Sequence, residues 1–119
     1  YSYFTYVPLA IERMRQGAAY LVGEHDFKSF CSVQAQVEST IRQIDAVEVL
    51  QENQEIVIRV SGRGFLYNMV RIIAGTLMEV GRGHIEPEKV DEILRAKDRQ
   101  AAGPTAPACG LTLIKYEFL

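Results

Sequence analysis

The chain has 119 residues, of which 48% are hydrophobic, with 13 Lys or Arg against 15 Asp or Glu. This length is enough for one domain with its own core and too short for two, so residues 1–119 are expected to form a single domain. The net charge of −2 excludes a global attraction to nucleic acid, and any RNA contact must come from a local patch. No apolar run reaches the roughly 18 residues of a membrane span, so no membrane partner is expected.

The cysteines and histidines do not suggest a metal site. Cys31 and Cys109 lie far apart, which favours free thiols in a reducing compartment over a disulfide, and we expect a cytoplasmic protein. No two of Cys31, Cys109, His25 and His84 have the spacing of zinc ligands, so no metal is expected.

The chain opens with an aromatic segment and a helix. Residues 1–6, YSYFTY, alternate aromatic and small polar residues and indicate a strand or an extended arm. Pro8 begins a predicted helix that runs to about Val22, with Gly23 as its C-terminal stop. The positions expected on its inner face are Ala10, Met14, Ala18 and Leu21.

A β-hairpin is predicted next. Residues 37–50 indicate a long strand, and its apolar phase changes from Ile44 to Val47, which suggests a bulge or twist. QENQ, residues 51–54, is the predicted turn. The apolar residues that alternate along the returning strand are Ile56, Ile58 and Val60.

A long helix is predicted after Gly62 and Gly64, which end the returning strand. Its core stripe is Leu66, Met69, Val70, Ile73, Leu77 and Val80. We expect this stripe to pack on the sheet against Ile56 or Val57, Ile58, Val60 and Ile114. The other side carries Tyr67, Arg71, Ala74, Gly75 and Met78. A helix that is apolar nearly all round is normally covered on both sides. We expect the second covering layer to be missing from this chain, so that the isolated chain self-associates.

One more helix and one more strand complete the pattern. Pro87 begins the helix, with Val90, Ile93 and Leu94 facing inward. A loop, AAGPTAPACG, precedes the last strand, LTLIKYEFL. The order (β)αββααβ predicts an α+β fold, an antiparallel sheet with helices on one face, close to the ferredoxin-like or split-βαβ plan.

Arg71 is the only charged residue between Phe65 and Met78. Its guanidinium cannot lose its proton, and burying it without an anion is costly. Two explanations are open. Arg71 either pairs with a distant acid of this chain or extends to water, or it holds a catalytic carboxylate or an RNA phosphate in a polar pocket.

Three blocks of the sequence resemble the tRNA pseudouridine synthase A family. They are GEHDFKSF (23–30), GFLYNMVRIIAGTLMEVGRG (64–83) and AKDRQAAGPTAPACGL (96–111), in the order and spacing of the family. The resemblance runs from about Pro8 to Phe118. It implies the carboxyl-terminal half of a homodimeric enzyme that needs no cofactor and isomerises uridine to pseudouridine in the anticodon stem-loop of tRNA.

The resemblance also implies residue roles. Arg71, in the M-V-R triplet, corresponds to the partner of the catalytic aspartate, and Leu111 corresponds to a wall of the uracil pocket, with Gly110 beside it. The family's aspartate lies in an R-x-D-A/G motif. The aspartates of this chain, none of which lies in such a motif, are Asp26, Asp45, Asp91 and Asp98. We therefore expect the catalytic aspartate in an amino-terminal half outside these residues, and the chain alone to be inactive.

Other polar and aromatic residues have simpler explanations. The basic residues that flank the long helix and the Pro-rich loop are Arg63, Arg82, Lys97 and Arg99. They are either ordinary surface charge or a rim that binds tRNA phosphates. Phe27 and Phe30 are expected in the core, and Asp26 is expected to accept a hydrogen bond at a helix end.

Two alternative functions stay open. One is a non-catalytic RNA-binding module of the RRM type, which the element order fits. Neither central strand is expected to carry an aromatic cluster of the RRM kind, since EIVIRVSG has none, and this speaks against an RRM. The other is a dimerisation domain of ferredoxin-like shape, in which Arg71 has no purpose.

Overall fold

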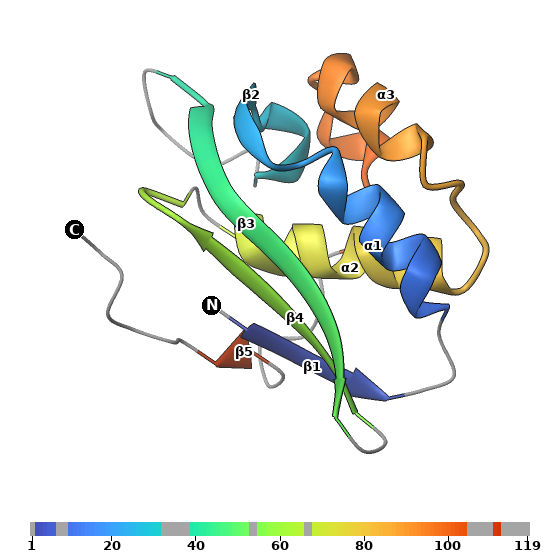
Figure 1. Ribbon diagram of the computed structural model, residues 1–119. Helices are drawn as coiled ribbons and strands as arrows, with labels where there is room; N and C mark the ends of the chain where they lie inside the picture. The colour runs from blue at the N-terminus through green and yellow to red at the C-terminus, as the bar shows by residue number, and fades with distance from the viewer. Residues whose placement is uncertain are drawn as a thin grey trace.

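The computed structural model has a five-stranded antiparallel sheet with helices packed on one of its faces (Figure 1). The structure describes residues 2–6, 10–31, 39–52, 55–65, 68–104 and 111–112. Within these ranges, no helix is long and apolar enough to cross a membrane.

The strand order agrees with the predicted class. The strands are β1 (Ser2–Tyr6), β2 (Gly23–Asp26), β3 (Ile41–Glu52), β4 (Glu55–Gly62) and β5 (Leu111–Thr112). The helices are α1 (Ile11–Ala19), α2 (Met69–Gly81) and α3 (Lys89–Ala96), with short 3₁₀ helices η1 (Lys28–Phe30) and η2 (Arg99–Ala101). The sheet order is β2-β3-β4-β1-β5. Without β2, this is the split-βαβ arrangement, so the predicted α+β, ferredoxin-like fold is confirmed.

β2 is a strand that the sequence pattern does not predict. GEHD has no apolar alternation, and it is a strand because it pairs with β3, from Gly23 opposite Ile44 to Asp26 opposite Ile41. The helix before it is shorter than predicted. α1 ends at Ala19, and Gly23, with a φ of 110°, begins β2 instead of stopping the helix. Of the four residues expected on the inner face of α1, Met14, Ala18 and Leu21 are buried and Ala10 is exposed.

The predicted hairpin is formed by β3 and β4. The register shifts between Ile44 and Ala46, which confirms the predicted bulge. The ladder extends to Glu52 opposite Glu55, so the connection is shorter than the predicted turn. The residues of β4 expected to face the core are all buried: Ile56, Ile58 and Val60.

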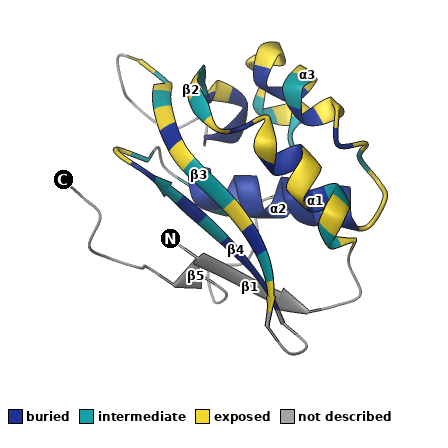
Figure 2. Ribbon diagram, in the orientation of Figure 1, coloured by how far each residue is buried: buried dark blue, intermediate teal, exposed yellow. Residues whose placement is uncertain are grey.

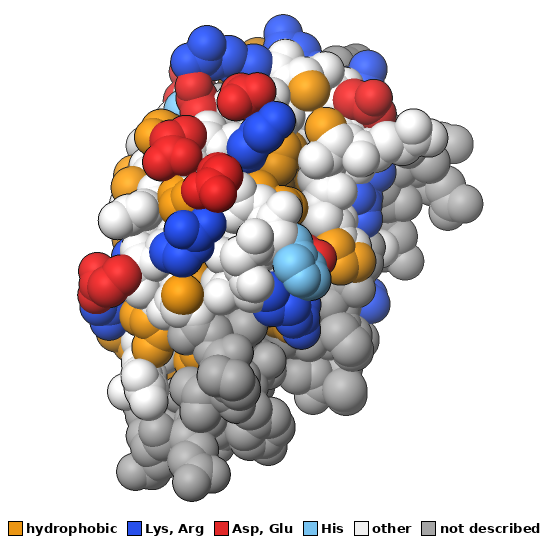
Figure 3. Space-filling model, turned by 90° about the vertical axis from the view of Figure 1, so that its right-hand side faces the viewer, with side chains coloured by type: hydrophobic (Ala, Val, Ile, Leu, Met, Phe, Trp, Pro, Cys, Tyr) orange, Lys and Arg blue, Asp and Glu red, His pale blue; other side chains and the backbone are white. Residues whose placement is uncertain are grey.

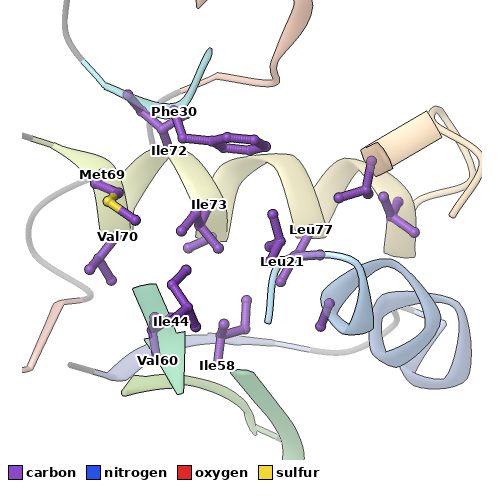
Figure 4. Packing of buried hydrophobic residues seen from close by; sticks show 14 of the residues in the cluster. Leu21, Phe30, Ile44, Ile58, Val60, Met69, Val70, Ile72, Ile73 and Leu77 are labelled. Atoms are coloured by element: carbon purple, nitrogen blue, oxygen red, sulfur yellow. The ribbon is translucent and has the colours of Figure 1, made fainter. Parts of the chain in front are cut away.

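α2 packs on the sheet through the predicted stripe. The side chains that point toward one another in Figure 4 are Val70, Ile73 and Leu77 of α2 and Ile44, Ile58 and Val60 of the sheet. Met69 and Val80 are buried as well. Leu66 and Ile114, also predicted in this contact, lie outside the described residues.

The other side of α2 is covered within the chain, so the expectation of a missing second layer is wrong. Gly75 is buried and Met78 is only 9% exposed, while Tyr67 lies outside the described residues. Figure 2 shows α2 buried along most of its length. The isolated chain therefore has no bare face at Gly75 and Met78 that would drive self-association.

Among the described residues, η1 and the segment after α3 contribute to this second layer. Ile72 lies beside Phe30 of η1 (Figure 4). The segment after α3 returns across α2, where a Cβ built on Gly103 would be 2.9 Å from the Cα of Thr76. The layer was hard to foresee because its elements are short and distant in sequence from α2.

Several smaller predictions are confirmed. Phe27 and Phe30 are both 0% exposed and pack edge to face. Asp26 accepts a hydrogen bond through Oδ1 from the backbone N–H of Lys28, the first residue of η1, at 3.1 Å. The inward residues of α3 are buried as predicted: Val90, Ile93 and Leu94.

The expectation that neither central strand of the sheet contains aromatic residues is wrong. The case against an RRM-type module rests on β4, which has no aromatic residue, as the central strand. The structure pairs β1 with β4, so the second central strand is SYFTY, which does contain aromatic residues.

Candidate functional site

Arg71 lies in the first turn of α2. It is half-buried, and it and Glu79 are the two residues of this helix that are not buried. Its Nη1 donates a hydrogen bond to Oδ1 of Asn68 at 3.1 Å. Asn68 precedes the helix with a φ of 59°, a left-handed conformation that Asn adopts more readily than most residues. An amide oxygen carries no net charge, so Asn68 orients the guanidinium without neutralising it.

The segment after α3 is fastened to the fold by two buried hydroxyls. Ser29 Oγ donates to the carbonyl oxygen of Ile93 at 2.7 Å and accepts from the N–H of Asp98 at 2.8 Å. Thr76 Oγ1, on α2, accepts from the N–H of Gly103 at 2.9 Å. Ser29 is 0% and Thr76 is 1% exposed, so water does not compete for these bonds.

Two of the four predicted basic rim residues lie at opposite ends of α2. Arg63 is exposed in the connection between β4 and α2, where it lines a hollow of about 200 Å³ with Gln43 and Asp45. Arg82 directly follows α2, about 16 Å along the helix axis from Arg71. Its Nη1 forms an ion pair with Glu79 at 2.6 Å.

The other two rim residues lie at and after the end of α3. Lys97 is exposed, has a φ of 51° and lines a hollow of about 300 Å³ with His25 and Asp26. Arg99 is half-buried and donates from Nη1 to the carbonyl oxygen of Gly103 at 2.9 Å. The surface in Figure 3 has acidic and basic side chains interspersed, so the described residues form no broad basic patch on this face.

Cys31 is a buried cysteine beside η1. It is a free, buried thiol, as expected, whereas Cys109 lies outside the described residues. Burial raises the pKa of the Cys31 thiol and Asp26 raises it further, so the thiol is protonated at neutral pH. The cations that lower the pKa of this thiol are Lys28, Arg42 and Arg99.

The predicted pocket residues near the end of the chain are only partly described. Leu111 begins β5, and its backbone pairs with Tyr3 of β1 at the edge of the sheet opposite β2. Gly110 lies outside the described residues.

Sequence reasoning did not single out four residues that connect these parts. The spacing of Asn68 and Arg71, three apart on a helix, is a signal that could have identified Asn68. Arg42 donates from Nε to the carbonyl oxygen of Gly64 at 2.7 Å and so holds the connection before α2. The other two are Ser29 and Thr76. No local pattern identifies them, because their partners are 64 and 27 residues away.

The fold and these contacts define a class of protein, an α+β domain of ferredoxin-like order whose central helix holds a half-buried arginine at its start. Comparison with known proteins gives the particular family. A model described as tRNA pseudouridine synthase matches residues 18–118, so the chain belongs to this family. The resemblance seen in the three sequence blocks is confirmed.

Individual relatives agree with this assignment. The tRNA pseudouridine synthase A of Halalkalibacterium halodurans is 49% identical over 111 residues, which cover 93% of this chain and 42% of the relative. The tRNA pseudouridine synthase A of Brevibacillus brevis is 53% identical over 106 residues, which cover 89% of this chain and 43% of the relative. The tRNA pseudouridine synthase A of Bacillus subtilis is 46% identical over 113 residues, which cover 95% of this chain and 46% of the relative. The chain therefore spans less than half the length of these relatives.

Proposed function

We propose that the protein isomerises uridine to pseudouridine in the anticodon stem-loop of tRNA, and that this chain supplies the carboxyl-terminal half of the active site. The family match and the names of the relatives support the reaction and the substrate. The observation that carries the proposal is the half-buried guanidinium of Arg71, inside the matched region, on a helix in which every residue except Arg71 and Glu79 is buried. The catalytic aspartate comes from the amino-terminal half of the protein.

The reaction rearranges one nucleoside and consumes no other reactant. The bond between N1 of uracil and C1′ of ribose breaks, the base turns, and C5 forms a new bond with C1′. The proton that C5 loses is balanced by the proton that N1 gains. A nucleotide within a stem reaches such a site only when it is flipped out of the stack, at a cost of a few kcal/mol.

Arg71 acts through the carboxylate of the catalytic aspartate. A neighbouring positive charge lowers the pKa of a carboxyl group, so Arg71 keeps the aspartate ionised at neutral pH and orients it by hydrogen bonds. Asn68 restrains the guanidinium in turn. Leu111 and Gly110 line the pocket for the detached uracil and exclude water from it.

The basic residues bind the tRNA backbone in this proposal. Arg63, Lys97 and Arg99 contact phosphates and add affinity without reading the base sequence. Arg82, at the far end of α2, contacts a different part of the tRNA. No cofactor is needed.

Assembly and location belong to the same proposal. The full-length protein is a cytoplasmic homodimer, as the family resemblance implies. The resemblance alone supports the dimer, because Gly75 and Met78 are buried within the chain. Sedimentation of the full-length protein tests it.

A non-catalytic RNA-binding module of the RRM type is the alternative. The observation in its favour is the pairing of the aromatic strand β1 with β4 near the centre of the sheet. It predicts that the full-length protein binds RNA and leaves uridine unchanged, which the experiment below distinguishes.

The deciding experiment uses the full-length protein and a tRNA labelled with tritium at C5 of uridine. Wild-type protein should release tritium, and Arg71→Ala should abolish or nearly abolish release with tRNA binding largely intact. Binding stays because it comes from many phosphate contacts. Arg71→Lys should restore activity only in part, because an ammonium lacks the planar two-pronged geometry of a guanidinium.

A thermal melt separates this role from a structural ion pair. Breaking a buried structural pair costs about 3–5 kcal/mol and lowers the melting temperature together with activity. A catalytic partner can be lost with little change in stability, because the aspartate left behind can take up a proton. Arg15→Ala, which removes an exposed guanidinium from α1, is the matched control and should remain active. An Arg71→Ala variant that melts normally and still modifies tRNA at the wild-type rate contradicts the role of Arg71.

A further inference from the structure

Asn68 does not cap α2 in the usual way. Asparagine is favoured just before a helix because, from an extended backbone, its side-chain oxygen accepts an N–H of the first turn. Asn68 is instead left-handed, with a φ of 59°, and its side chain forms no such bond with the helix. Its Oδ1 accepts from Nη1 of Arg71 at 3.1 Å. The side chain that would ordinarily cap α2 therefore holds the guanidinium.

Asn68 and Arg71 are both fixed by the start of the helix. The carbonyl oxygen of Asn68 accepts the N–H of Ile72 at 2.9 Å, which ties the backbone of Asn68 to the first turn. Met69 and Ile72, which follow Asn68 and Arg71 in the chain, are 0% and 1% exposed and lie in the packed cluster of Figure 4. The amide and the guanidinium are three residues apart and meet directly, with no intervening segment.

The amide fixes the direction of the guanidinium without matching its charge. An amide oxygen carries no net charge, and the first turn of α2 contains no acidic residue. An aspartate at position 68 would have nearly the same shape and would form an ion pair with Arg71. It would also favour the helix, because negative charge stabilises a helix N-terminus. The neutral side chain therefore calls for an explanation other than helix stability.

We propose that Asn68 is a positioning residue that aims the guanidinium of Arg71 at the catalytic aspartate without competing for its charge. This inference rests on the proposed function, since it concerns the partner of the same aspartate. Asn68 does not touch the reacting atoms and acts through Arg71, where misplacement by about 1 Å can cost roughly 100-fold in rate. A carboxylate at position 68 would compete with the catalytic aspartate for the same guanidinium.

Two variants of the full-length protein separate the direction of the guanidinium from its charge. Asn68→Gly keeps the left-handed backbone and removes the acceptor, so kcat for pseudouridine formation should fall roughly 10-fold. Asn68→Asp keeps an acceptor of the same shape and adds the competing charge, so kcat should fall further, by roughly 100-fold. KM for tRNA should change less than about threefold in both, because affinity comes from phosphate contacts. A hydrogen bond alone predicts the reverse order, with Asn68→Asp the more active variant.

Thermal melts distinguish this role from a structural one. Asn68→Asp should melt at or above the wild-type temperature while its kcat falls, because the ion pair and the helix dipole both favour the fold. A structural role predicts that the melting temperature and kcat fall together. Gln16→Glu, which turns an exposed amide of α1 into a carboxylate, is the matched control for the added charge and should leave kcat unchanged.

A double variant tests whether Asn68 acts through Arg71. In an Arg71→Lys protein, Asn68→Gly should lower kcat by less than about twofold, because two residues that act through one contact are not additive. Three results overturn the inference while the proposed function stands: an equal loss in both backgrounds, Asn68→Asp at least as active as Asn68→Gly, or Asn68→Asp melting below the wild type. A wild-type protein that forms no pseudouridine overturns the proposed function itself.

Discussion

The two side chains of α2 that reach the surface have different surroundings. Arg71, near the start of the helix, is oriented by the neutral amide of Asn68. Glu79, near the end, is held by Nη1 of Arg82 at 2.6 Å and Nδ1 of His84 at 3.0 Å. Glu79 therefore belongs to a cluster that closes the helix end, whereas the Asn68 amide orients the guanidinium of Arg71 at the other end.

The Glu79 cluster should make stability depend on pH. Hydrogen bonds from His84 and then Arg82 lower the pKa of the Glu79 carboxyl group. Because its unfolded-state pKa is higher, at about 4.3, ionised Glu79 stabilises the fold above that pH, and the contribution is lost as pH falls through the folded-state pKa. Glu79→Gln should cost under about 1 kcal/mol at neutral pH, since such surface pairs are weak. Urea denaturation of both proteins should show this difference shrink as pH falls below the unfolded-state pKa, and a difference independent of pH contradicts it.

Ser29 should matter more for stability than an exposed serine. Ser29→Ala leaves the carbonyl oxygen of Ile93 and the N–H of Asp98 without a partner in a site that water does not reach. The expected cost is about 1–3 kcal/mol in the free energy of unfolding. Ser39→Ala, which removes an exposed hydroxyl bonded to Ile41, should change it by less than about 0.5 kcal/mol. Equal losses of unfolding free energy in the two variants would mean that the buried hydrogen bonds of Ser29 stabilise the fold no more than the exposed bond of Ser39.

At the scale of elements, α2 is an internal helix. The sheet covers one side, and η1 together with the segment at Gly103 covers the other (Figures 1 and 4). Ile73 faces the sheet and Ile72 lies beside Phe30, with 0% and 1% of their surfaces exposed. The helix is thus held from two directions, which fixes the orientation of Arg71.

Two neighbouring isoleucines test this arrangement. Ile72→Ala and Ile73→Ala should each lower the free energy of unfolding by about 2–5 kcal/mol, because each leaves a cavity between packed layers. Ile41→Ala, at a position that is 50% exposed, should have an effect under about 0.5 kcal/mol. Denaturant unfolding measures all three. A near-neutral Ile72→Ala would show that the second layer does not hold α2.

At the scale of the whole molecule, the proposed function makes this chain one wall of a catalytic cleft, and its sequence has no R-x-D-A/G motif. We expect the purified 119-residue chain to fold and to release no tritium from labelled tRNA, whereas full-length protein is active. The physical reason is that, in the proposed function, Arg71 and Leu111 hold a carboxylate and a base but cannot break the bond to C1′ themselves. Circular dichroism checks the fold, and measurable turnover by the chain alone would place a catalytic carboxylate within it.

The sequence alone predicts the parts of this protein that depend on neighbouring residues. The core stripe of α2, the inward face of α3 and the bulged hairpin follow from apolar periodicity, which any helix or strand with one buried face must show. Arg71 stands out for the same reason, as a charge in an apolar pattern. The three blocks are enough to identify the family.

Only the tertiary structure decides the features whose partners are distant in sequence. GEHD is a strand because it pairs with β3. The side of α2 away from the sheet is buried because η1 and the segment at Gly103 pack on it. The bonds of Ser29 and Thr76 span 64 and 27 residues. Neighbouring residues in the sequence do not predict such contacts, because the two partners meet only after the chain between them has folded.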